Sequence, residues 1–247
     1  MISKNESIKN LVTASEDDET RRFMGMTKEQ ISDYIANRED LDRLFKIRTL
    51  TKEQIDQAIK IGEDLYVLYA NQKLTPKQVD EAIDLGEWLN VLYSYQKLTS
   101  KQIDKALDRG ECLNALYEHQ VLSVRQIDKA ISLGVNLDDL IKFQKLNTPQ
   151  IDKLMQIEDY LLYLYEYQKL TSNQVDKAMS LEKYLDYLYQ YQVLTQDQID
   201  RAVDIGKDLA DLYRYQKILS EDTISKAIRK GKHLCFLYEF QRLTKKQ

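Results

Sequence analysis

The chain of 247 residues contains only seven glycines and two prolines, which excludes a turn-rich β protein of this length and favours helix throughout. Its formal net charge of −4, with both signs interspersed, fits a solvated helical surface better than a dedicated nucleic-acid groove. The two cysteines, Cys112 and Cys235, have no CxxC partner, so we interpret them as thiols in a reducing compartment.

Residues 1–25 precede the regular part of the chain. They begin Met1-Ile2-Ser3 without the apolar stretch of a signal peptide, and no segment approaches the roughly 18 uninterrupted apolar residues of a membrane span. We therefore expect a cytoplasmic protein that does not associate with membranes. The acidic run at residues 15–19 has no helical pattern, so we expect residues 1–25 to form an irregular polar cap over the first repeat.

Residues 26–242 consist of nine copies of one 24-residue pattern. The segment LTPKQVD at residues 74–80, for example, returns as LTSKQID at residues 98–104. Position 1 of the nine repeats is occupied by Met26, Leu50, Leu74, Leu98, Leu122, Leu146, Leu170, Leu194 and Leu219. One extra residue falls near residues 217–218, and residues 243–247 open an incomplete tenth repeat. A period of this length predicts a solenoid.

The first half of each repeat predicts a helix of about ten residues, because apolar residues recur at positions 6, 9 and 10. Thr or Ser at position 2 with Gln at position 5, as in Thr75 and Gln78, predicts a capping box at its start. Glycine at position 13 of six repeats predicts a left-handed residue at its end. Arg38, Glu158 and Glu182 replace this glycine, and there we expect turns of different shape or some strain.

The second half of each repeat predicts a shorter helix. Leu occupies positions 16 and 19, Tyr usually follows at position 20, and Gln occupies position 23 from Gln72 to Gln241. Helices this short are marginal alone and must be stabilised by stacking on their neighbours. The sequence therefore predicts an all-α fold, a right- or left-handed α-solenoid of about nine 24-residue helix–turn–helix repeats.

No motif in the chain indicates catalysis or cofactor binding. The two histidines, His119 and His233, lack metal-ligand spacing, and Walker A, GxGxxG, GxSxG and CxxC motifs are missing from the sequence. The glycines stand one per repeat and cannot form a phosphate cradle. We expect a protein that is not an enzyme, with no metal site and no cofactor.

Two further positions carry the same residue in most repeats. Asp at position 7, from Asp56 to Asp200, has two interpretations: a row of charge that imitates a DNA backbone or binds cations, or residues that favour the helix dipole and pair between repeats. Frequent basic residues at position 8 favour the second interpretation. We expect Gln at position 23 to bond the turn of a neighbouring repeat.

Positions 15, 18 and 22 vary between repeats, are rich in tyrosine and are spaced to share one helix face. Tyrosine offers a rigid apolar ring with a polar tip, which suits interfaces. We expect part of this face, position 22 above all, to pack against the next repeat. The candidate partner-binding residues are Trp88, Tyr95, Tyr160, Tyr163, Tyr184, Tyr187, Tyr191 and Phe236.

The segment LTPKQV at residues 74–79 resembles the start of the TAL-effector DNA-binding repeat, which opens with a similar L-T-P-x-Q-V segment. The resemblance covers about six residues per repeat, and family repeats are about ten residues longer, with a variable pair in a glycine-bearing loop that reads a base. Here the matching loop is short, as at residues 84–86, and the chain lacks a basic lining. We interpret the shared segment as convergent capping-box chemistry. More broadly, the chain resembles the α-solenoid class.

These observations favour a non-catalytic adaptor or inhibitor that binds a protein partner along the tyrosine-rich face of its second helices. The alternative is a nucleic-acid-binding helical repeat protein that stacks bases on the same tyrosines and binds phosphates with its basic C-terminal half. Abundant Lys, Asn, Ile and Tyr fit an AT-rich genome, which would suit a bacteriophage protein that modulates a host protein. The sequence predicts neither the partner's identity nor the oligomeric state.

Overall fold

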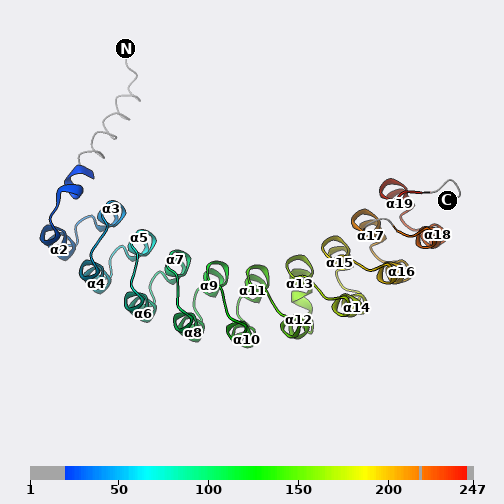
Figure 1. The fold of residues 1–247 in the computed structure, drawn as a ribbon, viewed down its shortest axis with the longest axis horizontal. Helices are drawn as coiled ribbons and strands as arrows, with labels where there is room; N and C mark the ends of the chain where they lie inside the picture. Colours follow the sequence, from blue (N-terminus) through cyan, green and yellow to red (C-terminus); the bar gives the residue numbers. More distant parts are fainter. Residues whose placement is uncertain (1–19, 217–218, 244–247) are drawn as a thin grey trace, which may run out of the picture. The chain divides into compact units, whose positions relative to one another are not determined.

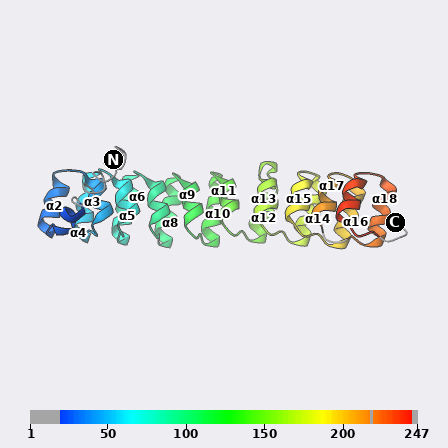
Figure 2. The ribbon, with the colours of Figure 1, turned by 90° about the horizontal axis from the view of Figure 1, so that it is seen from above.

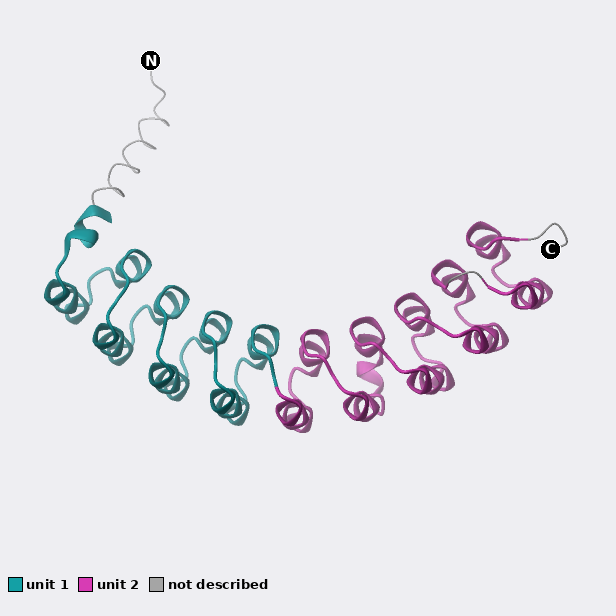
Figure 3. Ribbon diagram, in the orientation of Figure 1, with its two compact units in different colours: residues 1–122 teal, residues 123–247 magenta. Residues whose placement is uncertain are grey.

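The computed structural model describes residues 20–216 and 219–243, in which every repeat folds as a pair of helices. The chain divides into two compact units, unit 1 at Met1–Leu122 and unit 2 at Ser123–Gln247 (Figure 3). Within each unit, helices of successive repeats pack on one another in chain order. The predicted all-α solenoid fold is therefore confirmed.

The helices of each unit form two rows. In unit 1 the first helices are α2 (Lys28–Ala36), α4 (Lys52–Ile61), α6 (Pro76–Leu85) and α8 (Ser100–Arg109), and the second helices are α3 (Leu41–Ile47), α5 (Leu65–Asn71), α7 (Leu89–Tyr95) and α9 (Leu113–His119). In unit 2 the first helices are α10 (Val124–Leu133), α12 (Thr148–Leu154), α14 (Ser172–Leu181), α16 (Gln196–Ile205) and α18 (Glu221–Lys230). Its second helices are α11 (Leu137–Phe143), α13 (Leu161–Tyr167), α15 (Leu185–Tyr191), α17 (Leu209–Tyr215) and α19 (Leu234–Phe240). Within each unit the second helices form the inner row of a gentle arc (Figure 1), and helices of one row lie side by side (Figure 2).

Capping boxes start the first helices, as predicted. In α6 the Thr75 side chain accepts a hydrogen bond from the Gln78 backbone at 3.3 Å, and the Gln78 side chain accepts one from the Thr75 backbone at 2.8 Å. The same box is present in α2, α4, α8, α10, α12, α14 and α16. Each box satisfies two amide groups that a helix start otherwise leaves without partners.

The turn glycines have the predicted left-handed conformation, with φ between 69° and 81° at position 13. The three replacements show both expected outcomes. Arg38 and Glu182 keep the left-handed conformation, with φ of 57° and 52°, at the strain that a side chain brings there. Glu158 instead lies in a 3₁₀ helix, η1 (Glu158–Tyr160), because α12 ends after seven residues rather than ten.

Ion pairs between successive repeats accompany these replacements. The position 13 side chain of one repeat contacts position 14 of the next in all three cases, with N–O distances of 2.8–2.9 Å. The pairs are Arg38–Glu63, Glu158–Lys183 and Glu182–Lys207. All six side chains are exposed, so each pair contributes little stability. Pairing nevertheless explains the sign of the charge at Glu63, Lys183 and Lys207, each of which is opposite to that of its partner.

The residue before the second helix is also left-handed, which the sequence did not predict. Position 15 has φ between 40° and 53° in eight repeats, although none of them has glycine there. Asp and Asn tolerate the left-handed conformation, whereas it is unfavourable for the bulky side chains of Trp88 and Tyr184. Backbone preference therefore does not explain the aromatic residues at this position.

The core of each unit lies between the two rows. Leu at positions 16 and 19 is buried except at Leu234, which is half-buried, and tyrosine at position 20 is fully buried in six repeats, among them Tyr93 and Tyr189. Among the described residues, the buried hydroxyls of Tyr69, Tyr93, Tyr165, Tyr189 and Tyr213 have no hydrogen-bond partner. Burial raises the pKa of Tyr213 to about 12. These tyrosines therefore act as apolar core residues.

The glutamines at position 23 join successive repeats, as predicted. Gln192 accepts a hydrogen bond from the Leu170 amide at 3.0 Å and donates to the carbonyl oxygens of Tyr165 and Gln168 in the preceding repeat. Equivalent bonds within the units are made by Gln72, Gln96, Gln120, Gln168, Gln216 and Gln241. Each side chain satisfies backbone groups that would otherwise be buried without partners.

The aspartates at position 7 have a similar role, which favours their structural interpretation. Gln174, of a capping box, also donates to the Asp152 carboxylate of the preceding repeat at 2.8 Å. Asp56, Asp128 and Asp176 accept the same bond. These carboxylates therefore join repeats instead of forming a free row of charge.

The described part of the first segment differs from the irregular cap that we expected. Residues 20–25 are helical, and the buried ring of Phe23 contacts Tyr34 edge-on with centroids 5.4 Å apart. The acidic run, the extra residue near 217–218 and residues 244–247 of the tenth repeat lie outside the described residues. No helix in the described ranges is long and apolar enough to cross a membrane.

Candidate binding surface

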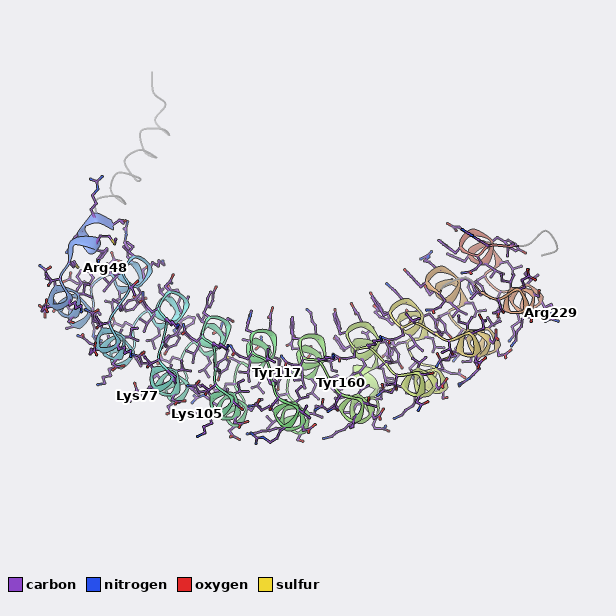
Figure 4. All side chains as sticks on the ribbon, viewed as in Figure 1. Arg48, Lys77, Lys105, Tyr117, Tyr160 and Arg229 are labelled. Carbon is purple, nitrogen blue, oxygen red and sulfur yellow. The ribbon has the colours of Figure 1, made fainter. Side chains whose placement is uncertain are left out.

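The inner face of each unit is formed by the side chains at positions 15, 17, 18, 21 and 22, on and just before the second helices. In Figure 4 side chains project from the inner row, whereas Lys77 and Lys105 lie on the outer row and Tyr117 lies between the rows. No first helix covers this face.

Position 22 is exposed in most repeats, and there the prediction that it packs against the next repeat is wrong; only Ile47 and Phe143 are half-buried. Aromatic residues at this position are 40–65% exposed at Tyr95, Tyr167, Tyr191, Tyr215 and Phe240. The reason is that position 22 is the last residue of a seven-residue helix, and the chain then turns away in extended conformation at position 23. Position 18 is the more buried one, since Val67 and Ala115 lie in the core.

In unit 1 the aromatic residues of the inner face are few. Trp88, just before α7, is exposed, and its ring lies 5.2 Å from that of Tyr66 on α5. Tyr95 ends α7 and is the most exposed tyrosine of the face. The other position 22 side chains near it are Asn71 and His119.

In unit 2 aromatic residues dominate the inner face. Tyr187 and Tyr191 lie on α15 with ring centroids 5.8 Å apart, and Tyr184 is exposed just before that helix. Tyr163 on α13 is half-buried. Phe236 on α19 stacks with Phe240 at 6.4 Å.

Tyr160 differs in backbone conformation from the other candidates at position 15, Trp88 and Tyr184. It belongs to the 3₁₀ turn η1, has a right-handed backbone and lies at the turn between α12 and α13 (Figure 4). The early end of α12 changes this turn, since Arg38 and Glu182 also replace the glycine and keep the ordinary turn. Position 15 of the repeat therefore did not predict the backbone conformation of Tyr160.

Grooves separate the position 22 side chains of consecutive repeats. In unit 2 a groove of about 350 Å³ is lined by Tyr167 and Tyr191, and one of about 270 Å³ by Tyr191 and Tyr215. In unit 1 grooves of about 400 and 380 Å³ adjoin Tyr95 on its two sides. Each groove is also lined by the glutamines at position 23. Around Tyr95 in unit 1, and from Tyr167 to Tyr215 in unit 2, the position 22 side chains therefore alternate with grooves.

Cations of the chain itself already occupy some of these rings. The Arg214 guanidinium lies 5.1 Å from the ring centroid of Phe236 and 5.4 Å from that of Phe240. Lys142 lies 4.8 Å from the ring of Phe143 and 6.0 Å from that of Tyr167. Such contacts are attractive because the face of an aromatic ring is electronegative.

Carboxylates border the same rings. A hydrogen bond to Glu166 raises the pKa of Tyr167. Burial, followed by the charges of Asp186 and Asp211, raises the pKa of Asp208, and Lys207 and His233 oppose that shift. Asp208 therefore lies close enough to Asp186 and to Asp211 for their charges to disfavour its ionised form.

The remaining sequence candidates do not form a chemical centre. Cys112 and Cys235 are exposed thiols, and His119 lies 3.8 Å from Glu118 at the surface. Within the described ranges, no group of three or more His, Cys, Asp or Glu side chains is arranged to hold a metal ion.

The sequence-based candidates omitted Tyr66, Tyr167, Tyr215 and Phe240, all of which are exposed on the inner face. The last three share position 22 with Tyr95 and Tyr191, so the signal was present but was attributed to packing. Tyr66 stands at position 17, which was not considered.

Comparison with known protein families, with curated proteins and with solved structures finds no match to this chain. The helical repeat architecture agrees with the α-solenoid class that the sequence resembles, and the TAL-effector-like opening of the repeats is used for capping and for bonds between repeats.

Proposed function

We propose that this protein is a non-catalytic scaffold that binds a protein partner along the inner face of its second helices, with the aromatic residues of unit 2 as the principal contacts. The observation that carries the proposal is the recurrence of exposed aromatic side chains at position 22. Tyr167, Tyr191 and Tyr215 occupy this position in three successive repeats of unit 2, and each is 40–42% exposed. Exposed aromatic residues in a contiguous row are typical of interaction surfaces.

The left-handed residues at position 15 support the same proposal. A side chain in this conformation costs roughly 1 kcal/mol relative to glycine. Trp88 and Tyr184 accept that cost while remaining exposed, so neither backbone preference nor core packing accounts for them. Binding of a partner would account for both.

The charge of the inner face opposes the nucleic-acid alternative. Glu166, Asp186, Asp208 and Asp211 lie among the tyrosines of unit 2, and a phosphate backbone needs basic contacts. Stacking on tyrosine is available, and Lys142 and Arg214 contact some of the rings. The four carboxylates would nevertheless repel a phosphate backbone. The face therefore suits a polypeptide better.

The test replaces the three position 22 tyrosines together, as Tyr167→Ser, Tyr191→Ser and Tyr215→Ser. Because hot-spot aromatic residues carry much of an interface's energy, we expect partner capture from cell lysate to fall at least about tenfold. The matched control is Leu133→Ser, Ile157→Ser and Leu181→Ser, which removes apolar side chains of 40–43% exposure from the first-helix row. The control should capture as well as the wild type.

Circular dichroism and thermal unfolding establish that both triple variants remain folded. If the tyrosine variant captures the same proteins in the same amounts as the control, the inner face is not the binding surface. Quantitative mass spectrometry of the captured proteins provides this comparison.

A further inference from the structure

Two adjoining grooves of unit 1 combine an exposed tyrosine with two lysines. The grooves lie at the ends of α5, α7 and α9, on the two sides of Tyr95, and have volumes of about 400 and 380 Å³. Lys73 and Lys97 line the first groove, and Lys97 also lines the second. Both lysines stand at position 24, one residue after the buried glutamine of their repeat, and both are exposed.

The positive charge of these grooves is not balanced by the chain. Among the described residues, no carboxylate lines either groove, and Lys73 and Lys97 form no ion pair or hydrogen bond. Lysine after a helix commonly bonds the last carbonyl groups of that helix. Here Gln96 already donates to the carbonyl oxygens of Tyr69 and Gln72. The ammonium groups therefore remain free to bind a ligand.

The two grooves described in unit 2 lack this excess of positive charge. Lys169 lines the groove between Tyr167 and Tyr191, but Glu166 lines it as well. The next groove has Val193 at position 24, and no charged residue lines it within the described part of the chain. Of the four grooves, the two in unit 1 are therefore the ones that suit an anionic ligand.

The tyrosine beside the lysines also has room for a ligand. Tyr95 is 65% exposed, and in the ranges that the structure describes no cation lies over its ring. In unit 2, by contrast, Lys142 and Arg214 lie over Tyr167 and Tyr215. A tyrosine offers an apolar ring and a hydroxyl that can hydrogen-bond, so it can pack on a peptide whose carboxylates pair with lysines.

The basic stretch is short, which indicates the size of the ligand. Position 24 is Thr49 in the repeat before Lys73 and Val121 in the repeat after Lys97. Packed helices lie roughly 8–10 Å apart, and alternate side chains of an extended peptide lie about 7 Å apart. Since lysine has a long flexible stem, two alternate carboxylates of such a peptide can each pair with one lysine. Two cations are few for nucleic acid, whose binding depends on neutralising many phosphates.

We propose that the two grooves beside Tyr95 bind a short, extended acidic segment of a partner protein, with its carboxylates paired with Lys73 and Lys97 and its stems packed on the tyrosine ring. This site is separate from the aromatic row of unit 2, and it does not rest on the function proposed above.

The test measures the binding of two fluorescent peptides to the full chain by anisotropy at low ionic strength. One peptide alternates glutamate and serine, and the other has glutamine in place of each glutamate. We expect the glutamate peptide to bind at least about tenfold more tightly, and added salt to weaken its binding, because the attraction is electrostatic.

The lysines are tested with Lys73→Gln and Lys97→Gln together, which should weaken binding of the glutamate peptide about tenfold. The matched control is Lys145→Gln with Lys169→Gln, which removes exposed lysines at the same position in unit 2. The control should bind the peptide as the wild type does. Circular dichroism and thermal unfolding show that both variants are folded.

The tyrosine is tested with Tyr95→Ala, which should weaken binding of the glutamate peptide about fivefold, because it removes the ring that the peptide packs on. Tyr191→Ala makes the same change at the same position of unit 2 and should leave binding unchanged. The triple replacement of Tyr167, Tyr191 and Tyr215 should also bind the peptide normally. Its effect on lysate capture is therefore a separate result, and the scaffold proposal can fail without affecting this site.

Four results would overturn the inference. The first two are equal binding of the glutamate and glutamine peptides, including binding of neither, and equal weakening by the two lysine variants. The third is normal binding by Tyr95→Ala. The fourth is tighter binding of a mixed single-stranded oligonucleotide of the same charge than of the glutamate peptide, which would indicate a nucleic-acid site.

Discussion

Units 1 and 2 share their internal architecture and differ in their inner faces. Position 18 holds the aliphatic residues Val67, Val91 and Ala115 in unit 1, whereas it holds Tyr163 and Phe236 among others in unit 2. Position 22 shows the same contrast, with one exposed tyrosine in unit 1 and a row of aromatic residues in unit 2. The capping boxes, the turns and the glutamine bonds are equivalent in both.

This difference separates the residues that hold a repeat together from those that give it a surface. A tyrosine at position 20 fills the core in both units, while a tyrosine two residues later contacts solvent. Aromatic enrichment of unit 2 is therefore not required by packing. We expect substitutions at position 20 to lower stability in the same way in both units. Substitutions at position 22 should weaken binding mainly in unit 2.

The largest effect is expected from truncation of the buried tyrosines. Tyr93→Ala in unit 1 and Tyr189→Ala in unit 2 should each lower the free energy of unfolding by about 3–5 kcal/mol, because each removes a fully buried ring. Tyr95→Ala and Tyr191→Ala, two residues later, should change it by less than about 0.5 kcal/mol. Urea denaturation followed by circular dichroism measures all four.

Similar losses from Tyr189→Ala and Tyr191→Ala would show that position 22 is structural, and the proposed binding face would lose its main support. A loss confined to one unit would instead contradict the shared architecture.

The sequence predicted most of the architecture because the repeat multiplies each local signal. One Thr-x-x-Gln pair is weak evidence for a helix start. Eight capping pairs at one spacing, one of them the variant Asn147 and Gln150, make the helix starts predictable. The bond from Gln at position 23 was predictable for the same reason. An amide kept in every repeat implies a partner that is also present in every repeat.

Other features were not predictable because they depend on exposure and on backbone geometry. Sequence spacing places position 22 beside the core-facing residues, but it does not reveal that the helix ends there. The left-handed residue at position 15 has no residue preference, since Asp64, Trp88 and Cys112 all adopt it. The changed turn at Tyr160 follows from the early end of α12, for which no single residue gave a signal.

A smaller loss is expected when the glutamine bonds are removed. Gln96→Leu and Gln192→Leu each leave one buried amide and two buried carbonyl groups without their partner. Both should lower the free energy of unfolding by about 2–4 kcal/mol, because unsatisfied buried polar groups cost roughly 1–3 kcal/mol each and neighbouring groups relax in part. Urea denaturation measures the loss.

Gln190→Leu is the control, since Gln190 is an exposed glutamine of α15, two residues before Gln192. It should leave stability unchanged within about 0.5 kcal/mol. If Gln192→Leu were equally harmless, the glutamines at position 23 would not hold the repeats together, and their recurrence would need a functional explanation.

The smallest effect concerns the carboxylates on which the two units differ. Burial and the charges of Asp186 and Asp211 raise the pKa of Asp208 above its ordinary value of 3.8. A carboxyl group whose pKa is raised in the folded state favours folding below its unfolded pKa, and this contribution is lost as the pH rises through the folded pKa. Asp208→Asn should therefore raise the melting temperature at about pH 7 and have almost no effect at about pH 3.

Asp64→Asn makes the same change at position 15 of unit 1, where Asp and Asn both tolerate the left-handed backbone. There Val67 replaces the carboxylate of Asp211, and Lys46 neutralises Asp42. Asp64→Asn should consequently raise the melting temperature over that of the wild type at about pH 7 by less than Asp208→Asn does. Equal gains would mean that the charges of Asp186 and Asp211 do not destabilise the folded state through Asp208. A larger gain at Asp208 would show that unit 2 holds its acidic face at the expense of stability, as a binding surface does.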